Sequence, residues 1–116
     1  PRVRVLEPGH AEVEIPDRRS NRQHLGSVHA IALANAAELA SGLAMLVGLP
    51  EGIRGIVVDL SIQYFKKARG TIRAVSTVVV PTVTTGTDLT ITADCLDSGR
   101  ELVARATVRW RLAPEP

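Results

Sequence analysis

Hydrophobic and polar residues alternate near the start of the chain in a pattern that predicts two short strands. Residues 3–5 and 11–15 place Val, Ala and Ile at every second position, on either side of Glu7-Pro8-Gly9-His10. A period of two is typical of strands with one buried face. Pro-Gly at the two central positions of that tetrapeptide suits a type II turn, so this segment predicts a β-hairpin.

A long apolar run follows and predicts a helix over residues 28–47. Glu38 is the only Asp, Glu, Lys or Arg in this run, which also contains no proline. Ser27 precedes the run as a candidate N-cap, and Gly48 and Pro50 end it. Apolar residues cover nearly the whole circumference of this helix, which is typical of a helix buried on most sides. We expect this helix to form the core.

After the helix the pattern changes to β-branched alternation and predicts four more strands. Gly70, Pro81 and Asp97-Ser98-Gly99 separate these strands at intervals typical of hairpins. We therefore expect strands adjacent in sequence to pair antiparallel. The predicted strands cover residues 56–65, 71–80, 87–96 and 101–112.

Together these elements predict an α+β fold in which an antiparallel sheet of about five to six strands curls around a long central helix. A length of 116 residues suits one modest domain, and 45% hydrophobic residues suffice for a core, so we expect residues 1–116 to form a single domain. Such a sheet has exposed edges. Pairing with further copies would cover them, which predicts a homodimer or homotetramer.

Charge, cysteine content and the N-terminus narrow the classes of function. A formal charge of +2 argues against binding to a nucleic-acid backbone. Cys95 is the single cysteine, which fits a reducing compartment, so we expect a cytoplasmic protein. The N-terminus lacks the pattern of a signal peptide and begins abruptly, as though a segment preceded it. Asn35, Glu38 and Ser41 interrupt the apolar residues 30–47, which argues against membrane insertion.

Glu38 is the most informative polar residue because it lies in the middle of the apolar helix. Asn35 precedes it by three positions and Ser41 follows it by three, so the spacing predicts a slanted polar seam along one side of the helix. Two interpretations are open. The carboxylate faces solvent or is satisfied at an interface, or it is a catalytic base whose pKa is raised by burial toward neutral pH.

The start of the helix is a second candidate site. Gly26-Ser27-Val28-His29-Ala30 would leave the first backbone N–H groups unpaired at the positive end of the helix dipole. The N–H of Ala30 could there stabilise an oxyanion, while His29 could equally be an ordinary capping or packing histidine. His29 and Glu38 are nine positions apart, on opposite helix faces, so a shared site would require two subunits.

The residues around these two positions resemble the hotdog thioesterases of the phenylacetate-degradation type. The resemblance rests on Gln23-His24-Leu25-Gly26-Ser27-Val28-His29-Ala30 followed by Glu38, and on residues 6–11, 63–68 and 106–110. It is strongest to an uncharacterised, DUF4442-like branch in which His-Ala replaces His-Gly and Glu replaces Asp. Covering residues 3–112, it implies a hotdog fold and hydrolysis of an acyl thioester, with acyl-coenzyme A as substrate and no separate cofactor.

The same resemblance implies roles for individual residues. Glu38 would be the base or nucleophile, the N–H of Ala30 the oxyanion donor, and His29 would shape the helix start. Gln23 would stand where the family has the Asn that positions the attacking water. Gln23 is one methylene longer than Asn, Asn21 stands nearby as a substitute, and Ala30-Ile31 in place of Gly-Gly narrows the approach of a substrate.

Other residues are expected to contact the substrate. Lys66, Lys67 and Arg69 form a basic cluster where, by the resemblance, a coenzyme A phosphate would lie at a subunit boundary, although such clusters are commonly solvated strand ends. The loop of residues 18–22 is a second basic candidate. The full expected set is Asn21, Gly26, Asn35, Ser41, Gln63, Lys66, Lys67 and Arg69.

Three classes of function therefore stay open. The leading one is a metal-free thioester hydrolase, because His10, His24 and His29 show no ligand-like spacing with carboxylates. The second is a non-catalytic protein that binds acyl groups or acyl-coenzyme A, motivated by Gln23 and Ala30. The third, a hotdog dehydratase or hydratase, is disfavoured because the chain has no stretch like Asp-x-Asn-Pro-x-x-His.

Overall fold

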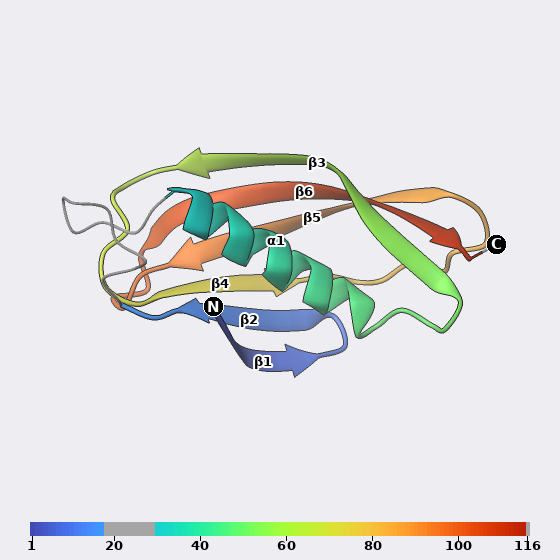
Figure 1. Ribbon diagram of the computed structural model, residues 1–116, viewed down its shortest axis with the longest axis horizontal. Helices are drawn as coiled ribbons and strands as arrows, with labels where there is room; N and C mark the ends of the chain where they lie inside the picture. Colours follow the sequence, from blue (N-terminus) through green and yellow to red (C-terminus); the bar gives the residue numbers. More distant parts are fainter. Residues whose placement is uncertain (18–29, 116) are drawn as a thin grey trace.

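The chain folds into one long helix lying on a six-stranded sheet, and the computed structural model describes residues 1–17 and 30–115 (Figure 1). This arrangement confirms the predicted α+β class. The strands differ little from the sequence prediction, except that β3 begins earlier and β4 ends earlier. The elements in chain order are β1 (Arg2–Glu7), β2 (His10–Ile15), α1 (Ala30–Leu46), β3 (Ile53–Tyr64), β4 (Ile72–Thr77), β5 (Thr87–Leu96) and β6 (Leu102–Pro114).

The strands lie in the order β1-β2-β4-β5-β6-β3, and every described neighbouring pair is antiparallel. The expectation that sequence neighbours pair is correct for β1–β2, β4–β5 and β5–β6 but wrong for β3 and β4. Helix α1 carries the chain across the sheet, so β3 joins the far edge beside β6 and the chain then returns to place β4 beside β2 (Figure 1). Strands β1 and β3 are consequently the two edges.

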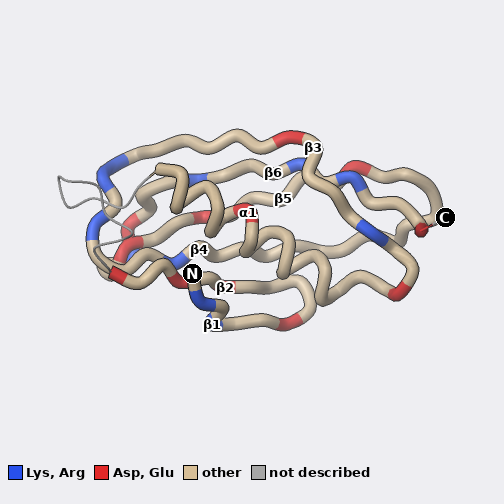
Figure 2. The backbone as a smooth tube through the Cα atoms, viewed as in Figure 1, with Lys and Arg blue, Asp and Glu red and all other residues tan. Residues whose placement is uncertain are grey.

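The sheet has an apolar face under α1 and a polar outer face. Strand β4 illustrates the alternation, since Ile72, Ala74 and Ser76 are buried while Arg73 and Val75 are only partly covered. The charged residues lie along the strands and at the ends of the molecule, whereas Glu38 is the only one on α1 (Figure 2). The alternation with period two thus gives each strand one side for the core.

Helix α1 is buried on one face only. It packs through small side chains, because Ala36, Ala37, Ala40 and Ala44 are all at most 1% exposed. Its other face leaves Ile31 74% exposed. The expectation of a helix buried on most sides was therefore wrong for the single chain, because the sheet covers one side of α1 (Figure 1). No helix within residues 1–17 and 30–115 has the length and apolar content needed to cross a bilayer.

The β1–β2 turn fastens the hairpin to the rest of the molecule through Gly9. Its N–H donates to the carbonyl of Ala44 at 3.0 Å, and its own carbonyl accepts from the N–H of Val78 at 2.8 Å. Gly9 has φ of +80°, which fits the third position of the predicted type II turn. A Cβ at this position would lie 2.6 Å from the carbonyl oxygen of Val78.

Gly9→Ala is expected to destabilise the protein by about 2 to 4 kcal/mol, because it adds a left-handed alanine and a clash with fixed backbone. Chemical denaturation measures the free energy of unfolding. Gly52→Ala is the matched control, since Gly52 has φ of +82° and open space around its Cβ position. Equal losses in the two variants would show that the contact with Val78 contributes nothing.

Candidate active site on helix α1

The outward face of α1 carries the predicted carboxylate. Glu38 and Asn35 are both exposed there, beside Ile31 and the 38% exposed Leu39. These four positions follow the helical period, so they share one side of the helix. In the part of the chain that the structure describes, the Glu38 side chain is exposed, as the first of its two sequence interpretations expects.

Ser41 is buried whereas Asn35 and Glu38 are exposed, so the predicted seam of Asn35, Glu38 and Ser41 is not formed. The Ser41 hydroxyl is fully buried and donates to the backbone carbonyl of Glu38 at 2.8 Å. It accepts a hydrogen bond from Nε1 of Trp110 at 3.3 Å. Each step of three residues turns the direction by about 60°, so residues six apart differ by about 120°, which explains the error. Ser41 thus joins α1 to β6.

The start of α1 contacts the end of strand β3. The Tyr64 hydroxyl donates to the carbonyl of Ala30 at 3.0 Å. Burial raises the pKa of Tyr64, as does the neighbouring Cys95, so the phenol keeps its proton for this bond. Tyr64 was missed from the sequence, although alternation along β3 puts it on the helix side. It holds the first helical residue in place while Ala30 itself remains exposed.

Gln63 lies on the other face of the sheet and is not brought near the helix start. Its register partner is Arg105, whose side chain is paired on the outer face with Asp94 at 2.7 Å, whereas the partner of Tyr64 is the buried Ala104. Successive side chains in a strand point to opposite faces. The prediction that Gln63 contacts the same substrate as Ala30 therefore finds no support in the position of this residue.

Four other predicted site residues lie outside the described residues: Asn21, Gln23, Gly26 and His29. Their expected roles stay predictions. Cys95, in contrast, lies beneath the first turn of α1, where its Sγ contacts the carbonyl of Leu33 at 3.9 Å. Burial raises the pKa of this thiol to about 12, so it stays protonated near neutral pH and does not act as a nucleophile.

The basic cluster after β3 is partly neutralised. Lys66 pairs with Asp97 at 3.1 Å and with Glu101, and hydrogen bonds to Glu101 and then Asp97 raise its pKa. Lys67 is exposed and, among the described residues, forms no hydrogen bond or ion pair. Arg69 is exposed and has an interaction of its own. Of the three predicted phosphate contacts, Lys67 is therefore the one that could bind a phosphate without first breaking an existing interaction.

A metal centre is not assembled by the part of the chain that the structure describes, because no three His, Cys, Asp or Glu side chains gather there. The chemically useful groups on the helix side are thus the Glu38 carboxylate and the backbone N–H groups of the first helical turn, which lack intrahelical acceptors. Glu38 follows Ala30 by about 12 Å along the axis at the usual rise. One helix cannot bring both groups to one small ligand.

Comparisons with known proteins show what this arrangement resembles. Residues 1–112 match the family described as a domain of unknown function, DUF4442. The structure designated genomics APC5556 is 34% identical, with a TM-score of 0.86, 97% of this chain covered and 76% of that one. PA5026 from Pseudomonas aeruginosa, described as a probable thioesterase, is 24% identical, with a TM-score of 0.89 and coverage of 98% and 83%.

A third similar structure is smu.793 from Streptococcus mutans bound to acetyl CoA, at 19% identity, a TM-score of 0.81 and coverage of 98% and 89%. These likenesses confirm the predicted hotdog fold. A search of curated proteins found no match. The distant structural relatives thus include thioesterases, at identities that establish the fold.

Ser41→Ala should destabilise the protein by about 1 to 3 kcal/mol, because it leaves the buried Nε1 of Trp110 without its acceptor. Urea unfolding followed by Trp fluorescence measures the change. Ser61→Ala, at an exposed position of β3, serves as the control and should shift stability by less than about 0.5 kcal/mol. If Ser41→Ala were as stable as the control, the bond from Trp110 would not hold α1 on the sheet.

Proposed function

We propose that the chain hydrolyses acyl thioesters, with acyl-coenzyme A as substrate, because it belongs to the DUF4442 family and shares its fold with a probable thioesterase and with a protein bound to acetyl CoA. The observation that carries the proposal is the exposed Glu38, the single charged residue on the exposed face of α1. Burying a carboxylate among apolar neighbours costs free energy unless the carboxylate has a hydrogen-bonding or charged partner, so a carboxylate at this place suggests a functional role. Its neighbours Ile31 and Leu39 offer apolar surface for an acyl chain or for a second copy.

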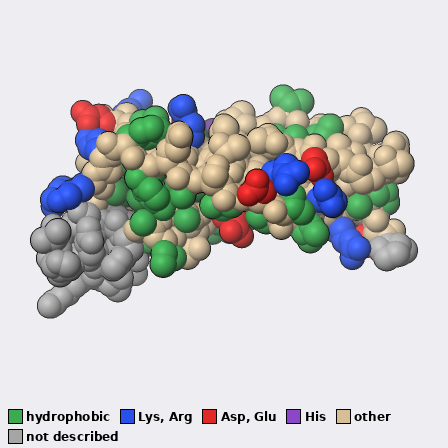
Figure 3. Space-filling model, turned by 90° about the horizontal axis from the view of Figure 1, so that it is seen from above, with side chains coloured by type: hydrophobic (Ala, Val, Ile, Leu, Met, Phe, Trp, Pro, Cys, Tyr) green, Lys and Arg blue, Asp and Glu red, His purple; other side chains and the backbone are tan. Residues whose placement is uncertain are grey.

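The proposed site spans two copies of the chain, which form a homodimer or a dimer of dimers. Strand β3 is an edge with one free side, and Ile56 and Val58 on it are 59% and 37% exposed. Hydrophobic side chains gather on the side of the molecule along which β3 lies (Figure 3). An edge strand with apolar side chains favours pairing with another strand, and pairing here would bring the α1 helices of two copies together.

In the proposed reaction, Glu38 of one copy removes a proton from water, and the resulting oxygen attacks the thioester carbonyl carbon. The N–H groups at the start of α1 in the other copy stabilise the negative charge that develops on the carbonyl oxygen. The carbon–sulfur bond then breaks, and the departing thiolate takes the proton from Glu38. The products are a carboxylic acid and a thiol, and direct attack by Glu38 on the carbonyl carbon is the alternative first step.

Three further elements of the proposal concern binding. Tyr64 keeps the first turn of α1 in place through the carbonyl of Ala30. Lys67 is the proposed contact for a coenzyme A phosphate, because its ammonium has no partner among the described residues. Asn35, one turn before Glu38 on the same face, is the proposed polar contact for the acyl group or the attacking water. The lone thiol of Cys95 is compatible with a cytoplasmic location.

Glu38→Gln is expected to lower thioester hydrolysis by about 100-fold or more, since an amide cannot accept the proton from water. Release of free thiol from a panel of acyl-coenzyme A substrates measures the rate. The fold should be retained, because Glu38 is exposed. Glu51→Gln, an exposed carboxylate in the turn before β3, is the matched control and should keep full activity.

Unchanged hydrolysis in Glu38→Gln would remove Glu38 from the mechanism. Saturable binding of acyl-coenzyme A by the wild-type chain without any thiol release would instead favour the second candidate, a non-catalytic acyl-binding protein. This candidate is kept because Ala30-Ile31 replaces the Gly-Gly of the phenylacetate-degradation thioesterases, and the added side chains narrow the approach to the helix start.

Ile56→Lys should convert the assembly to monomers and abolish hydrolysis together with it, because a lysine on an edge strand opposes pairing with a second strand. Light scattering after size-exclusion chromatography measures the mass, and thiol release measures the activity. Val79→Lys is the control, since Val79 is 90% exposed and lies away from β3, between β4 and β5. A monomeric variant with full activity would contradict a site shared between two copies.

A further inference from the structure

A cavity of about 470 Å³ lies on the outer face of the sheet, on the side opposite α1. The outward side chains of Val75 on β4 and Leu96 on β5 are its apolar residues. Its volume is in the range of small-molecule sites, which combine an apolar surface with a few polar groups. This outer cavity shares no residue with the helix-side site proposed above.

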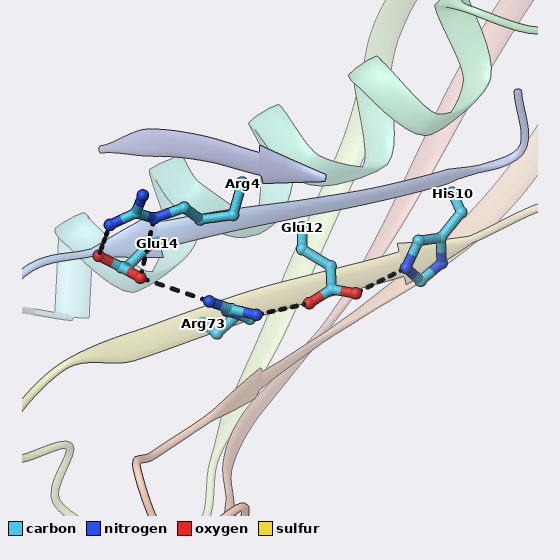
Figure 4. A network of polar contacts seen from close by, with 5 residues as sticks. All are labelled: Arg4, His10, Glu12, Glu14 and Arg73. Carbon is cyan, nitrogen blue, oxygen red and sulfur yellow. Dashed lines mark hydrogen bonds and ion pairs between the residues drawn. The ribbon is translucent and has the colours of Figure 1, made fainter. Parts of the chain in front are cut away.

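The two glutamates of β2 that line the outer cavity are already neutralised (Figure 4). Glu14 accepts two hydrogen bonds of 3.1 Å from Arg4, and Arg73 bridges Glu14 at 3.4 Å and Glu12 at 3.1 Å. Glu12 also accepts from Nε2 of His10 at 2.8 Å. The side chains of Glu12 and Glu14 are only 20% and 13% exposed. Glu12 and Glu14 are therefore held in place, and the guanidinium of Arg73 is bound to both of them.

The third carboxylate of the outer cavity, Asp97, is neutralised as well. Its Oδ1 accepts from the N–H groups of Gly99 and Glu101, each at 3.0 Å, and its Oδ2 accepts from Lys66 at 3.1 Å. These bonds lower the pKa of Asp97, the one from the N–H of Glu101 first. Asp97 thus orders the turn that closes one end of the outer cavity, and its charge is already paired with Lys66.

Arg100 differs from every other charged residue of the outer cavity because its guanidinium has no hydrogen bond or ion pair among the described residues. It also has φ of +62°, the left-handed region that strains an arginine and suits glycine. The position with positive φ is thus occupied by an arginine, although a glycine, Gly99, immediately precedes it. An observed outlier of this kind is a reason to seek a function for the side chain.

We propose that the outer cavity binds a small organic monocarboxylate, whose charged end pairs with Arg100 and whose apolar part lies on Val75 and Leu96. Guanidinium and carboxylate match in charge and in their paired hydrogen bonds. The hydroxyls of Thr71 and Ser98, which also line the outer cavity, can donate to the same ligand. A phosphate dianion fits less well, since Arg100 supplies a single unpaired positive charge for its two negative charges. An ammonium ligand finds each of the three carboxylates occupied.

Titration of the full chain with sodium hexanoate, followed by backbone amide NMR, tests this proposal. Saturable shifts are expected at the amides of Val75 and residues 98–101. Arg100→Gly should weaken hexanoate binding about tenfold or more through loss of a charge-assisted pair. Its melting temperature should be unchanged or higher, because glycine adopts positive φ without strain. Arg54→Ala, which removes an exposed arginine outside the outer cavity, should bind hexanoate as the wild type does.

Two comparison ligands sharpen the assignment. Hexylammonium and inorganic phosphate should leave the amides of residues 98–101 unshifted at concentrations that saturate with hexanoate. The proposal is overturned if Arg100→Gly binds hexanoate with wild-type affinity, if hexylammonium produces the same shifts, or if hexanoate shifts none of the amides around the outer cavity. Because the readout is binding at the outer face, it is independent of whether the chain hydrolyses thioesters.

Discussion

The packing of α1 on the sheet through small side chains determines which residues of the helix reach solvent. A Cβ at Gly42 would lie 3.0 Å from the ring of Trp110, so glycine leaves room for this ring against the helix. The hydrogen bond from Trp110 to Ser41 fixes the rotation of the helix at the same place. Because Ala36, Ala37, Ala40 and Ala44 face the sheet, Glu38 lies on the exposed side of α1.

The strands could be predicted from the sequence because each has one side in the core, and burial imposes a period of two on the residues themselves. The order of the strands could not, since the alternation in β3 and β4 says which face is buried and nothing about the neighbour. The buried side of α1 was also beyond prediction. Alanine suits either environment, and the exposed side carries Ile31 as well, so the apolar pattern covers the whole circumference.

For the candidate site, the sequence located the carboxylate and the helix start, and simple periodicity would have corrected two assignments. Ser41 stands about 120° around the helix from Asn35, which already separates it from the exposed side. Gln63 and Tyr64 are adjacent in a strand and therefore point to opposite faces, so only one of them could reach α1. The role of Tyr64 could not be predicted, because it depends on a hydrogen bond to the carbonyl of Ala30. These two residues are far apart in sequence, and no local sequence pattern indicates that they are in contact.

The two faces of the sheet differ in what they offer to another molecule. On the outer face Arg105 and Arg111 are each bound to an aspartate of β5. A second protein that covered this face would have to remove water from these ion pairs, and the free-energy cost of that desolvation would offset much of the gain from the contact. The β3 edge offers unpaired backbone groups and apolar side chains. In a dimer formed through that edge, the outer face would stay in solvent, and a ligand could reach the unpaired guanidinium of Arg100 in the dimer as well as in the single chain.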